Sequence, residues 1–116
     1  MASCTTDCVE LACVPAAIAP DERPAHFALI RRLFADLVRE RADLPNGYAY
    51  RFPPDAFDAL ARFVANERKC CPFLDFELEL GANAGPIWLR LTGPAGTRAI
   101  LEAELHNSGT APPGEV

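Results

Sequence analysis

Pro72 separates two segments whose hydrophobic residues repeat with different periods, and this change of period constrains the fold most. Before it, residues 57–71 place apolar side chains three and four positions apart, which is typical of one buried face of a helix. After it, residues 74–80 alternate apolar with acidic side chains, which indicates a half-exposed antiparallel strand. Because proline cannot continue a helix and pushes the preceding residue away from helical angles, the sequence predicts a helix-to-strand junction at Cys70-Cys71.

The buried stripe of this expected helix ends in polar residues. Continuing the three-and-four spacing past the apolar positions gives Glu67 and then Cys71, so both side chains should point inward. An unpaired buried carboxylate costs several kcal/mol, so Glu67 needs a partner, which can be a cation, a metal or a hydrogen-bond donor from another segment. The apolar members of the stripe are Phe57, Leu60, Ala61 and Val64.

The adjacent thiols of Cys70 and Cys71 suit a metal-ligand role better than the role of a free nucleophile. The C-terminal end of a helix carries roughly half a negative charge, which disfavours a thiolate. A bound soft cation reverses this balance because it deprotonates a coordinating thiol. A disulfide between the two neighbours is the least favoured use, because its eight-membered ring is strained.

Length and composition exclude several classes of function. The 116 residues predict a single domain, and the net charge of −5 provides no electrostatic attraction for nucleic acid or an anionic membrane. The sequence has neither a signal-peptide pattern nor an apolar run long enough to span a membrane, so we expect a cytoplasmic protein. Thiols stay reduced in that compartment, so the five cysteines favour metal or redox use over a disulfide framework.

The remaining patterns predict a two-layer α+β domain with the order strand, helix, strand, helix, hairpin, helix. Its sheet should be largely antiparallel and covered by helices on one face. Cys13 should lie on the core-facing side of the first strand. The expected strands are 9–14, 48–52, 74–80 and 87–91, and the expected helices are 21–41, 53–71 and about 93–106.

The two ends of the chain differ in composition from the expected domain at residues 9–107. Residues 1–8 should form a flexible leader, and residues 108–116 should form a disordered tail rich in Gly, Thr and Pro. Cys4 and Cys8 in the leader are either auxiliary ligands or residues without a fixed role. His26 has no second histidine close by, and no role is assigned to it.

The segment Glu67-Arg68-Lys69-Cys70-Cys71-Pro72-Phe73 resembles a group of small bacterial proteins and domains associated with heavy-metal resistance. Some of these resemble C-terminal extensions of MerR-type regulators. In that group a short strand with one cysteine, here at residues 11–13, precedes a long helix. A Gly-x-x-aromatic strand follows, here at residues 47–52, and a hairpin ends near residues 89–94. The match covers roughly residues 9–106, and the cysteine-pair segment is its specific part.

The resemblance implies that Cys13, Cys70, Cys71 and Glu67 act as a set of metal ligands. Three soft sulfurs and one carboxylate suit a thiophilic metal or metalloid, which leaves mercury, arsenic, zinc and copper as candidates. We therefore expect thiolate-based binding of a soft ion for resistance, sensing or transfer. The expected partner is the metal ion, with no nucleic acid and no membrane, and a homodimer is left open.

Two other functions remain as alternatives. In a thiol enzyme, Cys70 or Cys71 would attack while Glu67 transfers a proton, as in organometal cleavage or a redox step. In a structural or interaction domain, the cysteines would pack in the core like other small apolar residues.

Overall fold

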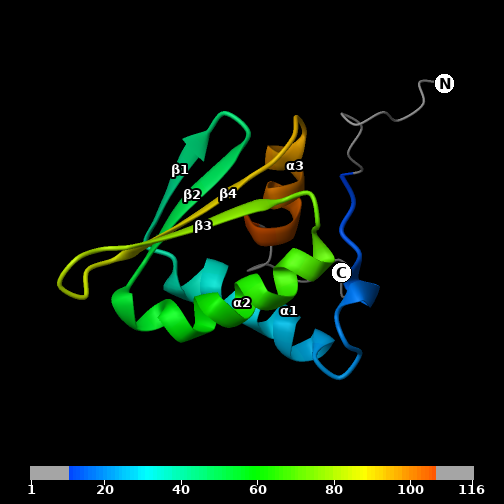
Figure 1. The fold of residues 1–116 in the computed structure, drawn as a ribbon, viewed down its shortest axis with the longest axis horizontal. Helices are drawn as coiled ribbons and strands as arrows, with labels where there is room; N and C mark the ends of the chain where they lie inside the picture. The colour runs from blue at the N-terminus through cyan, green and yellow to red at the C-terminus, as the bar shows by residue number, and fades with distance from the viewer. Residues whose placement is uncertain (1–10, 107–116) are drawn as a thin grey trace.

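Four antiparallel strands form one sheet in the computed structural model of the protein, which describes residues 11–106 (Figure 1). The strands lie in the order β1-β2-β4-β3, and every neighbouring pair is antiparallel. The predicted α+β class is confirmed. In chain order the strands are β1 (Glu40–Leu44), β2 (Gly47–Phe52), β3 (Asp75–Leu80) and β4 (Ile87–Thr92).

Three α-helices alternate along the chain with two β-hairpins, β1–β2 and β3–β4. The first and the third α-helix each continue directly into a short π-helix. The short helix η1 (Pro15–Ala17) comes first. The helix α2 is preceded by η3 (Pro54–Ala56) and ends at Cys70, as the position of Pro72 predicts. The helical segments are α1 (Arg23–Arg31) with η2 (Arg32–Leu37), α2 (Phe57–Cys70), and α3 (Thr97–Leu101) with η4 (Glu102–His106).

The helical layer covers one face of the sheet, and Tyr50 of β2 shows how. Its ring packs edge-on against Phe34 of η2 at 5.0 Å between centroids. Its hydroxyl oxygen lies 2.9 Å from Nε2 of His106 in η4, so η2 and η4 meet over the same strand. On β4 the buried side chains alternate with partly exposed ones, as expected for a sheet covered on one side.

Two expected elements differ in the structure. Residues 11–14 belong to no strand, while residues 9 and 10 lie outside the described part of the chain. The helix expected at 21–41 ends at Leu37, and β1 follows it. Pairing with β2 overrides the local helical preference of this charged segment, because β1 pairs with β2 along its whole length and Glu40 accepts a 2.9 Å hydrogen bond from Arg51.

The inward faces of two elements also depart from the predicted pattern. In α2, Phe63 is fully buried, whereas Phe57 is 42% exposed and Ala61 is exposed. Phe63 turns inward because it packs between the rings of Phe34 and His26. Leu80 was expected to face the core but is 57% exposed, since β3 ends there at the hairpin loop.

Within residues 11–106, no helix is long and apolar enough to cross a membrane. The predicted leader at 1–8, with Cys4 and Cys8, and the predicted tail at 108–116 lie outside the described residues. The division of the chain into leader, domain and tail therefore stays a prediction.

Candidate metal centre

Three cysteines from two distant segments meet at the C-terminal end of α2. Cys70 is the last residue of α2, and Cys71 caps it with backbone angles outside the helical range. Cys13 lies in the extended segment before η1, which runs beside this helix end (Figure 1). The two segments are joined there by a backbone hydrogen bond of 2.5 Å from the Val14 N–H to the Cys70 carbonyl oxygen.

The three sulfur atoms and one carboxylate form a compact set of donors. One ligand atom each from Cys13, Cys70, Cys71 and Glu104 lies within 4.8 Å of the other three. Tetrahedral zinc with Zn–S bonds of about 2.3 Å would separate its sulfurs by roughly 3.8 Å. Small side-chain movements therefore suffice for this group to hold a metal ion.

Glu104 is the member of this group that sequence analysis missed. It extends from η4, and its Oε1 lies 3.6 Å from the sulfur of Cys71 and 3.8 Å from that of Cys13. Nothing in the local sequence connects residue 104 with the cysteines. Only the packing of the last helical turn against the end of α2 brings them together.

Glu67 lies beside the cysteines but outside that compact donor group. Its side chain is fully buried, as predicted, and its Oε2 lies 3.3 Å from the sulfur of Cys71, where a reduced thiol can donate a hydrogen bond. Its Oε1 is 2.8 Å from Nε2 of His26, which is also buried. The expected need for a partner is therefore confirmed, while the predicted role of Glu67 as a metal ligand stays a prediction.

His26 is the second residue whose importance the sequence did not signal. It lies on the inward side of α1, where it is buried, while its neighbour Phe27 is 36% exposed. Burial lowers the pKa of His26, so the imidazole is neutral near pH 7. Its Nδ1 has no hydrogen-bond partner among residues 11–106.

Burial changes the protonation of the acidic groups around the sulfurs. It raises the pKa of Glu67 to about 6, and burial together with the charge of Glu67 raises the pKa of Glu104 to about 9. A hydrogen bond links the two carboxyl groups, so they retain a proton between them at neutral pH. Burial and these carboxylates also raise the pKa of Cys70 to about 12. Without a cation, Cys70 is therefore a protonated thiol rather than a ready nucleophile.

Cys13 and Cys71 are also placed to form a disulfide with each other. These two sulfur atoms lie at disulfide distance, and their Cα atoms are 4.5 Å apart, which falls within the range for protein disulfides. Cys70 is the free cysteine of the described part. Oxidation would therefore consume two of the three sulfur donors, and the metal-binding form requires the reduced chain.

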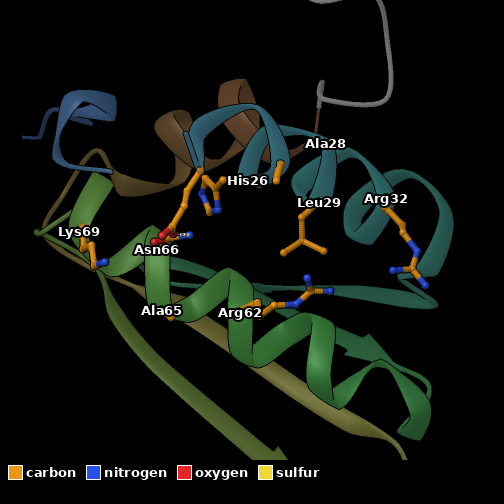
Figure 2. Close-up of a pocket in the computed structure, with 10 residues that line it drawn as sticks. His26, Ala28, Leu29, Arg32, Arg62, Ala65, Asn66 and Lys69 are labelled. Atoms are coloured by element: carbon orange, nitrogen blue, oxygen red, sulfur yellow. Dashed lines mark hydrogen bonds between the residues drawn. The ribbon is translucent and has the colours of Figure 1, made fainter. Parts of the chain in front are cut away.

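Two cavities lie near the cysteines. An apolar cleft of about 490 Å³ opens onto Cys13, Cys70 and Glu104. Figure 2 shows the other, a cleft of about 590 Å³ between α1 and α2. The second cleft is lined by His26, by the acidic Glu22 and by three basic residues, which are Arg32, Arg62 and Lys69. The remaining lining of the apolar cleft consists of Leu11, Pro15, Phe27, Ala99, Ile100 and Ala103.

Comparison with known proteins yields no assignment. No protein-family model, curated protein or solved structure matches the chain. The resemblance to heavy-metal-resistance proteins therefore stays a prediction, and the case for a metal centre rests on the geometry of its donors.

Proposed function

We propose that the reduced chain binds one soft metal or metalloid ion for resistance, sensing or transfer. The ligands are the thiolates of Cys13, Cys70 and Cys71, and Glu104 supplies a fourth donor. The observation that carries this proposal is the position of these four ligand atoms within 4.8 Å of one another. Thiolate-rich sites favour thiophilic ions, so mercury, arsenic, zinc and copper remain the candidates.

The surroundings of the sulfurs support a ligand role. Thiols buried next to carboxylates are hard to ionise, which works against a free nucleophile, whereas a bound cation favours the deprotonated form. Glu67 accepts a hydrogen bond from Cys71 and is itself held by His26. In this proposal the pair orients Cys71 from outside the coordination sphere, as partners of metal ligands commonly do.

An anaerobic titration of the reduced protein tests this function. Zinc(II), arsenite and mercury(II) are added in turn while thiolate-to-metal absorption is followed in the ultraviolet. We expect a saturable transition at one equivalent that is lost in Cys70→Ser/Cys71→Ser and weakened about tenfold in Glu67→Gln. A Cys4→Ser/Cys8→Ser variant is the matched control and should retain the transition. Equal uptake by the Cys70→Ser/Cys71→Ser variant would refute the proposal.

A thiol enzyme is the second candidate, and the proton retained between Glu67 and Glu104 favours it. In organometal cleavage a cysteine sulfur would bond to the metal while the carbon–metal bond breaks. The carboxyl proton would move to the carbon, which leaves as a hydrocarbon, and the proton of the attacking thiol would replace it on the carboxyl group. Phenylmercury acetate tests this reaction, because gas chromatography detects the benzene released. An enzyme loses benzene release but not metal uptake in Glu67→Gln, whereas a protein that only binds metal releases no benzene.

A further inference from the structure

We infer that the centre accepts a metal or metalloid that carries an organic group, and that this group lies in the apolar cleft beside the cysteines. The inference rests on the proposed function and specifies the class of species that is bound. It starts from a shared surface, because Cys13, Cys70 and Glu104 belong both to the donor group and to the wall of the cleft of about 490 Å³. Three of the four donor residues thus border an apolar space.

The burial of the cysteines makes this cleft the route of entry. Cys70 and Cys71 are 1% and 0% exposed, whereas Cys13 is partly exposed. The sulfur of Cys71, which does not line the cleft, contacts the buried carboxylate of Glu67, and this carboxylate is in turn paired with the buried His26. An incoming species therefore passes the apolar wall before it reaches the sulfurs.

The chemistry of that wall favours one kind of species. A hydrated inorganic ion has no apolar surface to bury, so it gains nothing from the side chains of Phe27 and Ile100 that line the cleft. An aryl group gains directly from this contact, and a dry apolar cavity of about 150 Å³ already suffices for benzene. Burial of roughly 60–100 Å² of an aryl group, at about 25 cal/mol per Å², corresponds to about 10- to 70-fold tighter binding.

The number of cysteines that line the cleft also matches such a species. Phenylarsine oxide reacts with two thiols, forming two As–S bonds, while its oxygen leaves as water with the two thiol protons. The carbon–arsenic bond and the oxidation state of arsenic are unchanged. Cys13 and Cys70 are the two cysteines that line the cleft. Arsenite can bond to three thiols with loss of three waters, so it would also engage Cys71.

The test compares three arsenicals on the reduced full-length chain by competition calorimetry: phenylarsine oxide, methylarsine oxide and arsenite. The phenyl and methyl compounds coordinate identically, so their ratio reports the contribution of the organic group. We expect the phenyl compound to bind about 10- to 70-fold more tightly. Cys71→Ser should weaken arsenite binding at least tenfold and leave phenylarsine oxide binding within threefold.

Filling the cleft provides the second arm of the test. Ala99 is exposed on α3 and lines the apolar cleft, so Ala99→Trp should reduce the phenyl preference to below threefold without weakening arsenite binding. Ala65 is equally exposed but lines the cleft between α1 and α2 (Figure 2), so Ala65→Trp is the matched control and should leave the preference unchanged. Circular dichroism checks that both variants fold.

The outcomes separate this inference from the function on which it rests. Arsenite binding with no preference for phenyl over methyl in the unmodified chain would overturn the inference and leave the metal centre intact. A preference that survives Ala99→Trp would overturn the assignment to this cleft. Failure of all three arsenicals to bind would overturn the inference, whereas the proposed function would fall only if zinc(II) and mercury(II) also failed to bind in the titration described above.

Discussion

The link between Cys13 and Cys71 predicts a large effect of redox state on stability. The two cysteines are 58 positions apart in the sequence. Closing a loop of that length in the unfolded chain lowers its entropy by about 14 cal/mol/K, which corresponds to about 4 kcal/mol at 25 °C. The oxidised protein should therefore unfold with a free energy up to about 4 kcal/mol higher than the reduced protein. With an m value of about 1.5 kcal/mol/M, its urea midpoint should lie roughly 2 to 3 M higher.

Equilibrium unfolding in urea, followed by circular dichroism with and without reductant, measures this difference. Cys13→Ser should behave identically in both conditions, because it lacks the partner of Cys71. Cys70→Ser is the matched control and should retain the full redox effect, since Cys70 is the free cysteine of the described part. Equal midpoints for oxidised and reduced wild type, or a redox effect that survives Cys13→Ser, would refute the reasoning.

Three further predictions concern the buried groups. Glu67→Ala should lower the free energy of unfolding by about 2–4 kcal/mol, because it leaves a cavity and an unpaired His26, whereas Glu67→Gln should cost about 1 kcal/mol; urea unfolding of the two variants checks this. The raised pKa values of Glu67 and Glu104 mean that their stabilising contribution is complete below pH 4.5 and lost as the pH rises toward 9. His26 has a lowered pKa, so its stabilising contribution is instead lost as the pH falls below 6.5. The reduced metal-free protein should therefore melt at a lower temperature at pH 9 than at pH 6.5, and Glu104→Gln should make this difference smaller. An equal melting temperature at the two pH values would contradict the prediction. Phe63→Ala should cost about 3–5 kcal/mol in urea unfolding, and the exposed Phe57→Ala less than about 1 kcal/mol; similar losses would mean that the burial of Phe63 contributes little.

The sequence predicts best those elements whose borders are marked by local chemistry. Pro72 marks the end of α2, and the alternation that follows it predicts β3 and β4 with small errors at the ends. The strand β1 was missed because its charged residues are compatible with a helix, and only pairing with β2 decides their conformation. The inward turn of Phe63 likewise depends on Phe34 and His26, which belong to other elements.

The same division holds for the candidate site. The meeting of Cys13 with the cysteine pair was expected from a family resemblance, and the inward direction of Glu67 and Cys71 followed from helical periodicity. Glu104 and His26 could not be found in this way, because their roles depend on how η4 and α1 pack against α2. A carboxylate or imidazole on a helix is usually at the surface, and its burial is a property of the tertiary fold.

The wide spacing of the donors along the chain has a consequence for how a bound ion would leave the protein. Cys13 and Glu104 stand 91 positions apart, and the cysteine pair lies between them. An extended chain retains only the adjacent thiols of Cys70 and Cys71 as near neighbours. Retention of the ion would therefore depend on the intact tertiary structure, so one proteolytic cut between residues 13 and 70 would reduce the affinity of every fragment. Proteolytic degradation of the protein would then release the bound ion as soon as the chain is cut.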